Sequence, residues 1–292
     1  MDEATKKKIG DAWTGNRGTT RRRWWASPRI IRYVNELVCG EPLDGWNAGP
    51  IRLMQQHFAA GFGSALSIGS GAATKEIALV QQNIVDHFDI YELSAARIAE
   101  AQRKVHELGL EKHFHFCKED YFSTEATKKY DMVFFDNALH HMFDTDHAVR
   151  VACEQLNDNG CFFCNDFVGA TRFQWSDLEL FIVNGIRSQL PHFLFKYGET
   201  LIKRYIYRPT IEAMLEQDPS EAADSDSIIP AVKKYITNPL IINAGGLVYN
   251  LACSDILLNI KDDSQLLGQM LEFDRQTIAH GFQHYAFILG KK

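Results

Sequence analysis

Residues 65–74 read Ala-Leu-Ser-Ile-Gly-Ser-Gly-Ala-Ala-Thr, an apolar run that ends in a glycine-rich turn. The pattern predicts a buried strand over 65–69, a tight loop at Gly69 and Gly71, and a helix over 74–82. Glycines let a backbone approach a ligand closely, and the first N–H groups of the following helix are free to bind it. The stretch indicates a ligand-binding strand–loop–helix unit; a tight turn without a ligand is the alternative, because short Gly-x-Gly patterns are common.

The alternation of strand-like and helix-like segments continues as far as Phe167. Strands are expected at 83–92, 113–117, 130–136 and 161–167, and helices at 95–108 and 144–156. Such alternation is typical of a parallel sheet with crossover helices. The predicted fold class is therefore α/β, with a doubly wound and mostly parallel sheet.

Helical sequence follows the fifth predicted strand. Ser176-Asp177-Leu178-Glu179 is a capping box, which predicts a helix start at that point. The acidic segment 219–230 is expected to be a loop, and 285–289 a last strand. We divide the chain into an N-terminal basic and aromatic helical arm and cap at 1–60, a cofactor-binding core at 61–170, a helical insertion or lid at 171–246, and C-terminal helices with the last strand at 247–292.

The composition places the chain among globular proteins. It has 292 residues, of which 46% are hydrophobic and 23% charged, and this excludes disordered, collagenous and disulfide-framework classes. No apolar run approaches the roughly 20 residues of a membrane span, and the charged amino terminus does not fit a signal peptide, so we expect a cytoplasmic protein. The six cysteines are expected to be thiols, with Cys161 and Cys164 facing opposite sides of one buried strand rather than forming a redox or metal pair.

The net charge of −6 is unevenly placed along the chain. Residues 1–32 carry a charge of +6, so the remaining 260 residues carry −12. A basic arm on an acidic body can bind a nucleic acid, an anionic membrane or an anionic small molecule, or it can dock on the body itself. Charge alone leaves these alternatives open.

Polar side chains follow the second and third predicted strands, at the carboxyl edge where such sheets bind ligands. Glu92 closes the second strand 23 positions after Gly69, close to the roughly 20-residue offset of a ribose-binding acid. A surface glutamate at a helix start is the alternative reading of Glu92. Asp120 and Tyr121 follow the third strand, where the carboxylate can accept a hydrogen bond from an adenine amino group and the ring can stack.

Two adjacent histidines, His140 and His141, follow the fourth predicted strand, just after Asn137. Imidazole titrates near neutrality, so each histidine is a candidate acid or base. Successive residues point in different directions, so we expect one of them to act in catalysis and the other to hold the loop. Adjacent histidines rarely bind one metal ion and no further ligand motif is evident, so no metal is expected.

Together these segments resemble class I S-adenosylmethionine-dependent methyltransferases. Residues 66–73 are similar to the family's first motif, 89–94 to its second-strand acidic motif, 118–120 to its adenine-side motif and 130–141 to its fourth-strand motif. The resemblance implies a seven-stranded Rossmann-like sheet and S-adenosylmethionine as the cofactor. The cofactor-binding residues that it implies are Gly69, Ser70, Gly71, Ala73, Glu92, Leu93, Asp120, Tyr121 and Asn137.

Two positions depart from the family's pattern. Ser67 stands two places before the first glycine, where the family usually has an acidic residue, and Ala73 stands where a third glycine is usual. The first departure weakens the expected contact to the methionine amino group of the cofactor. The second is expected to tighten the loop.

The fourth-strand motif bears on the acceptor, because it reads Asp-Asn-Ala-Leu-His-His over 136–141 and lacks the proline–aromatic pair found in enzymes that methylate amino groups of bases or glutamine. It resembles the branch that methylates small metabolites and natural products, which disfavours a nucleic-acid substrate. We expect O-methylation with His140 or His141 as the base, although nitrogen and carbon acceptors stay open. A nicotinamide-dependent oxidoreductase, whose fingerprint Thr74 breaks, and a non-catalytic protein that kept the fold are the alternatives.

Arg23, Trp24 and Trp25 have no place in the minimal sheet. They can cap the cofactor pocket and offer aromatic walls and a cation to an anionic acceptor. Packing against the body, or against a second subunit in a homodimer, is the alternative. The helical insertion after the fifth strand is likewise expected to form a lid over the same edge, or else a dimer surface.

Overall fold

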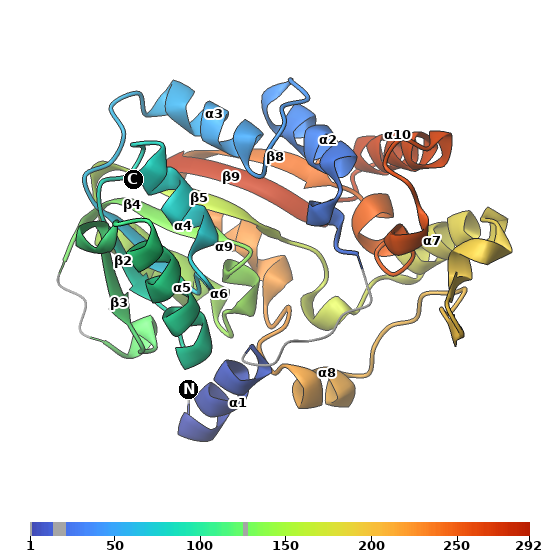
Figure 1. Cartoon of the computed structure of the whole chain (residues 1–292), viewed down its shortest axis with the longest axis horizontal. Helices are drawn as coiled ribbons and strands as arrows, with labels where there is room; N and C mark the ends of the chain where they lie inside the picture. Colours follow the sequence, from blue (N-terminus) through green and yellow to red (C-terminus); the bar gives the residue numbers. More distant parts are fainter. Residues whose placement is uncertain (1, 14–21, 125–127) are drawn as a thin grey trace.

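A seven-stranded sheet forms the centre of the computed structural model, which describes residues 2–13, 22–124 and 128–292 (Figure 1). Its strand order is β3-β2-β1-β4-β5-β9-β8. The parallel strands are β1 (Ala65–Ile68), β2 (Phe88–Tyr91), β3 (Phe114–Cys117), β4 (Tyr130–Asp136) and β5 (Leu156–Phe167). β9 (Tyr285–Lys291) runs antiparallel to β5, and β8 (Thr237–Gly245) runs antiparallel to β9. The predicted seven-stranded, mostly parallel α/β sheet is confirmed.

The strand order reverses beside β1. From β1 the chain builds β2 and β3 outward on one side, and then returns to place β4 and β5 on the other side. Crossover segments leave in opposite directions at this point, which opens a crevice beyond the carboxyl ends of β1 and β4. This crevice is where a ligand site is expected in a sheet of this kind.

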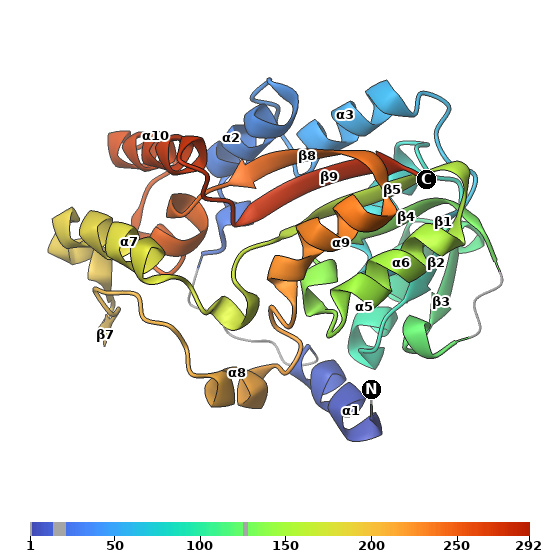
Figure 2. The ribbon, with the colours of Figure 1, turned by 180° about the vertical axis from the view of Figure 1, so that it is seen from behind.

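Helices enclose the sheet on both faces (Figures 1 and 2). The helices that bury apolar residues against one face are α2 (Pro28–Cys39), α3 (Ala48–His57), α4 (Thr74–Gln81), α5 (Ala95–Glu107) and α10 (Gln265–Ala279). α6 (Thr145–Gln155) and α9 (Ile228–Tyr235) cover the opposite face. β4 is almost entirely apolar because Met132 and Phe134 belong to the first core and Val133 and Phe135 to the second.

The remaining helices lie at the periphery. They are α1 (Glu3–Ala12), α7 (Asp177–Gln189) and α8 (Ile211–Gln217), and a short hairpin of β6 (Lys196–Tyr197) and β7 (Thr200–Leu201) lies between α7 and α8. The capping box at Ser176 is formed as predicted, with Ser176 Oγ accepting the N–H of Glu179 at 3.2 Å. No helix among the described residues is both long and apolar enough to cross a bilayer.

Cys161 and Cys164 confirm the predicted alternation in β5. Cys161 is buried in the core that contains α2 to α5, and Cys164 is buried in the core on the other face of the sheet. Both are free thiols, and burial raises the pKa of each. Two sulfurs on opposite faces of one strand cannot form a common redox or metal site.

The structure differs from the sequence prediction between residues 219 and 260. The end of the expected loop begins α9, and the last part of the interval 171–246 is β8, which lies in the main sheet. β8 was not predicted because Asn238, Pro239 and Gly245 all oppose strand formation; the register shifts near them, and pairing with β9 overrides local preference. Residues 247–260 form a π turn and a 3₁₀ turn rather than a continuous α-helix.

Candidate active site

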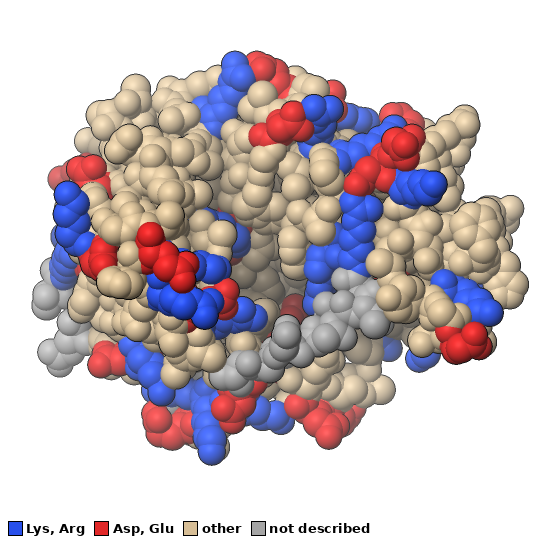
Figure 3. All heavy atoms as spheres, viewed as in Figure 1, with Lys and Arg blue, Asp and Glu red and all other residues tan. Residues whose placement is uncertain are grey.

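A cavity of about 1120 Å³ lies at the carboxyl edge of the sheet. Figure 3 shows that the face seen in Figure 1 is hollowed near its centre. The expected site residues that line this cavity are Trp25, Gly69, Ser70, Gly71, Glu92, Leu93, Asp120, Tyr121, Asn137 and His141. The expected site residues that do not line the cavity are Arg23, Trp24, Ala73 and His140.

The glycine loop between β1 and α4 has a left-handed backbone. Gly69 has a φ of 74° and Gly71 a φ of 58°, conformations that glycine adopts without steric cost. Ala73 adopts a φ of 49° at the N-cap of α4 and is fully buried. Ala73 therefore shapes the turn from beneath rather than contacting a ligand, and it holds the conformation that a glycine would otherwise provide.

Glu92 ties the glycine loop to the next strand. Its Oε2 accepts the N–H of Gly71 at 2.9 Å, and its Oε1 accepts the N–H of Ser94 at 2.8 Å. Burial raises the pKa of Glu92, an effect that these N–H groups partly offset. Each oxygen keeps acceptor capacity toward the cavity, which suits a pair of ribose hydroxyls.

Asp120 and Tyr121 form the neighbouring wall of the cavity. The Asp120 carboxylate accepts the N–H of Phe122 at 3.2 Å, which shapes a 3₁₀ turn, and the Tyr121 ring meets the Tyr91 ring edge-on at 4.7 Å. Helix α1 lies over this end, with Lys6 Nζ 3.7 Å from Asp120. The wall is aromatic and carries the carboxyl groups of Glu119 and Asp120, which suits a planar heterocycle that carries amino donors.

A buried polar cluster surrounds the end of β4. Lys75 Nζ lies 2.8 Å from Asp136 Oδ1, Asn137 Nδ2 donates to the same oxygen at 2.7 Å, and Asn47 donates to Asp136 Oδ2. Sequence reasoning did not single out Asn47, Lys75 or Asp136. Lys75 had a signal, since it is the second residue of the helix after the glycine loop; Asn47 had none.

Near Ser67, where the family usually has an acidic residue, Glu76 of helix α4 supplies a carboxyl group. Ser67 Oγ donates to Glu76 Oε1 at 2.7 Å, and both side chains are buried. Burial raises the pKa of Glu76 to about 7. The carboxyl group that the sequence lacks in β1 is thus present nearby on α4, behind the glycine loop.

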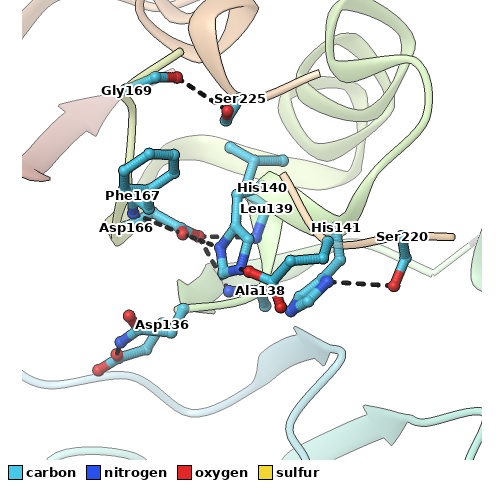
Figure 4. A network of polar contacts seen from close by, with 12 residues as sticks. Asp136, Ala138, Leu139, His140, His141, Asp166, Phe167, Gly169, Ser220 and Ser225 are labelled. Carbon is cyan, nitrogen blue, oxygen red and sulfur yellow. Dashed lines mark hydrogen bonds and ion pairs between the residues drawn. The ribbon is translucent and has the colours of Figure 1, made fainter. Parts of the chain in front are cut away.

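His140 is held by the end of β5. His140 is 6% exposed, and its Nδ1 bonds to Asp166 Oδ1 (Figure 4). Its Nε2 lies 3.7 Å from Glu221 Oε1. Burial alone would lower the pKa of His140, but the charge of Asp166 outweighs burial and raises it. His140 is therefore buried and paired with Asp166, and it is not among the residues that line the cavity. Asp166 was missed, although its place at a strand's carboxyl end was a usable signal.

His141 lines the cavity. Its Nδ1 lies 3.1 Å from Ser220 Oγ (Figure 4). The Ser220 hydroxyl donates to Asp218 Oδ1 at 2.7 Å. Because the Ser220 proton goes to Asp218, Ser220 accepts from His141 Nδ1–H, which leaves Nε2 with the free lone pair. Burial and the neighbouring His140 lower the pKa of His141 to about 4, so the ring is neutral at pH 7.

Ligand atoms of His140, His141 and Glu221 lie within 4.8 Å of one another. Such a group has the residue types of a metal site. Both Nδ1 atoms are already held by protein groups, so only the two Nε2 atoms and the Glu221 carboxylate remain available to an ion. The absence of a metal stays a prediction from the sequence.

The two tryptophans of the arm have different environments. Trp24 is 8% exposed, and its ring packs 5.2 Å from Trp46 and 5.2 Å from Tyr249. Trp25 is 43% exposed and lines the cavity, with the Arg23 guanidinium 5.5 Å over its ring. The expectation that both indoles cap the pocket is therefore corrected for Trp24, which is a core residue. Residues 14–21 of the basic segment lie outside the described residues.

Comparisons with known proteins agree with this architecture. Residues 63–202 match the family model of a methyltransferase domain. Geranyl diphosphate C-methyltransferase from Streptomyces coelicolor is 13% identical with a TM-score of 0.54, over 98% of this chain and 97% of that one. Phosphoethanolamine N-methyltransferase 2 from Haemonchus contortus is 16% identical with a TM-score of 0.52, over 90% of this chain and 57% of that one.

A methyltransferase from Clostridium acetobutylicum is 13% identical over 51% of this chain and 54% of that one, with a TM-score of 0.38. The match thus spans just over half the length of the Clostridium and Haemonchus proteins. No curated protein matches the chain in sequence. The family match, the strand order and the glycine loop lead to one conclusion: residues 63–202 carry a methyltransferase domain, and the chain has the class I fold of S-adenosylmethionine-dependent methyltransferases.

Proposed function

We propose that the chain transfers the methyl group of S-adenosylmethionine to a hydroxyl oxygen of a small-molecule acceptor. The residues fit the cofactor, because Glu92 offers two partly used carboxylate oxygens beside an open glycine loop and Asp120 lies beyond them. When bound, the cofactor supplies an electrophilic methyl group on a positive sulfur. Gly69, Gly71 and Asn137 would border it on the side of β1 and β4.

The observation that carries the proposal is the environment of His141. Its Nδ1 is held by Ser220, and its free Nε2 belongs to a neutral ring that lines the same cavity as the glycine loop. A neutral imidazole can take the hydroxyl proton as the acceptor oxygen attacks, and that proton would rest on Nε2. His140 is a positioning residue, because its bond to Asp166 fixes the loop that carries His141.

The rest of the rate enhancement would come from positioning the acceptor against the cofactor. Methyl transfer in line with the departing sulfur needs close alignment of the two reactants and little water. Trp13 and Ile9 line the cavity from the side of α1, and Trp25 and Trp46 line it from the arm and the start of α3. These apolar side chains would exclude water from the reacting atoms.

The test is a turnover assay with a panel of hydroxyl, amine and carbon acceptors. The release of S-adenosylhomocysteine is measured for each acceptor. With the acceptor so found, His141→Ala should lower kcat by about 10²- to 10⁴-fold and leave S-adenosylhomocysteine affinity within about twofold. His106→Ala is the matched control, because His106 lies on the exposed face of α5. Equal kcat for both variants on a hydroxyl acceptor would reject the base role of His141.

The charge of the acceptor is a further part of the proposal. Lys75 and Arg23 lie near the cavity and can attract an anionic group, although Lys75 is already paired with Asp136. A homodimer and a cytoplasmic location stay predictions from the sequence.

A further inference from the structure

The cavity extends beyond the glycine loop, Glu92 and Asp120. Besides Thr74 at the start of α4, four residues of the α4 region line it, Lys75, Ala78, Leu79 and Gln82. They follow the i, i+3, i+4, i+7 spacing of one helix face, so the cavity runs along the whole length of α4. At a rise of 1.5 Å per residue this branch is about 10 Å long.

This branch leads away from the cofactor residues. α4 starts at the carboxyl edge of the sheet and crosses back toward the opposite edge, as a crossover helix must. Gly71, Glu92 and Asp120 all lie at the carboxyl edge, beside β1 to β3. A cofactor held by these residues would lie at the carboxyl edge and would leave the groove beside α4 to another ligand.

The floor and far wall of the branch are apolar. Phe134 and Phe163 pair side by side in β4 and β5 and stack at 4.6 Å; with Leu79 they line the cavity, although all three are almost fully buried. Phe134 precedes Asp136 by two residues, so it lies on the same face of the sheet but deeper under the helices. Ile51 of α3 forms the opposite wall. Beyond Lys75, the side chains that line this branch carry no charge among the described residues.

The volume also exceeds the need of one ligand. The whole cavity measures about 1120 Å³, whereas pockets that take one drug-sized ligand measure roughly 300–1,000 Å³. The face in Figure 3 shows the hollow open to solvent at its centre. The apolar groove is continuous with the site of methyl transfer. Part of the methyl acceptor is therefore the ligand best suited to fill it.

We propose that the groove between α3 and α4 holds a hydrocarbon chain of the methyl acceptor, so that the acceptor is an alkyl or prenyl compound that carries its reactive group at one end. The inference rests on the proposed function, because the reactive end must reach His141 and the cofactor. The chain would lie along the partly exposed Ile51 and Ala78, above the buried Leu79, Phe134 and Phe163. Its far end would lie near Gln82, which is exposed. Asn47 and Lys75 would border the polar end.

Primary alcohols from butanol to decanol, each below its solubility limit, test the proposal on protein saturated with S-adenosylhomocysteine. Their affinity is measured by calorimetry and by the fluorescence of Trp25 and Trp46, which line the cavity. Affinity should rise about fourfold per methylene, the value expected for full burial of a CH₂ group, until the chain outgrows the groove. An affinity that does not depend on chain length overturns the proposal.

Ala78→Phe fills the groove halfway along and should weaken decanol binding at least tenfold while changing butanol binding far less. Ala78→Leu, a smaller change, should give an intermediate loss. Ala99→Phe on the exposed face of α5 is the matched control. Equal decanol affinity in the Ala78→Phe and Ala99→Phe variants overturns the proposal. S-adenosylhomocysteine binding is measured separately on each protein, and its loss in the unmodified chain would instead reject the proposed function.

Discussion

Replacing Asp166 by asparagine removes the charge that holds the His140 loop. The Asp166 carboxylate is fully buried, and its Oδ2 accepts the N–H groups of Ala138 at 2.9 Å and of Leu139 at 2.7 Å. Its Oδ1 accepts the N–H of Phe167 at 2.8 Å and bonds to Nδ1 of His140. An asparagine keeps one acceptor oxygen, so its NH₂ group would face two of these donors. The buried imidazolium would also lose its counter-charge.

The expected loss follows from the burial of the pair. Removing one partner of a buried ion pair costs about 3–5 kcal/mol, because the other charge stays buried without compensation. Urea denaturation should show a fall of this size in the free energy of unfolding of Asp166→Asn. Asp158→Asn, an exposed position in the same strand, should change it by less than about 0.5 kcal/mol. A loss below about 1 kcal/mol for Asp166→Asn would refute the assignment.

The pH dependence separates the ion pair from ordinary hydrogen bonds. Burial opposes ionisation of Asp166, yet His140 and the backbone N–H groups hold its pKa below the ordinary value, so its contribution is lost as pH falls below about 3.9. The pKa of His140 is raised, so its contribution is complete below about pH 6.5 and is lost as pH rises through the folded value. The difference between the unmodified chain and Asp166→Asn should be largest between about pH 4 and 6.5. A difference independent of pH would show that the pair is not ionised.

Other variants test the cofactor, the base and the arm. Glu92→Gln should weaken S-adenosylhomocysteine binding about 10- to 100-fold in calorimetry, because charge-assisted hydrogen bonds contribute roughly 1.5–3 kcal/mol. Glu107→Gln on α5 is the control, and equal affinities of the two variants would contradict the ribose contact. The kcat should be level near pH 7 and fall toward pH 4, since His141 must be neutral to accept a proton and its pKa is lowered to about 4. A fall of kcat centred near pH 6.5 would contradict the buried environment of His141. Trp24→Ala should lower the free energy of unfolding, measured by urea denaturation, by about 3–5 kcal/mol. Trp25→Ala should change it by less than about 1 kcal/mol and weaken acceptor binding instead. A larger loss of stability for Trp25→Ala than for Trp24→Ala would contradict the burial of Trp24 and the exposure of Trp25.

Local patterns were sufficient for the core of the fold. The apolar run before Gly69, the caps at Ser94 and Ser176, and the alternating segments to Phe167 each act through neighbours within a few residues, and the structure has strands and helices there. The same holds for the placement of Glu92, since parallel strands bring their carboxyl ends to one edge. The cofactor residues implied by the family resemblance stay predictions, but nine of the ten expected residues that line the cavity lie in the loops after β1 to β4.

Tertiary contacts decided the rest, because they join residues that no local pattern connects. Pairing with β9 makes a strand of β8 despite its proline and asparagines. The sequence left His140 and His141 equivalent; their environments differ because Asp166, 26 positions away, pairs with one, while Ser220, 79 positions away, holds the other beside the cavity. Burial likewise separates Trp24 from its exposed neighbour Trp25. Charge and burial around a side chain depend on the packed fold, so the chemistry of this site was fixed by distant segments of the chain.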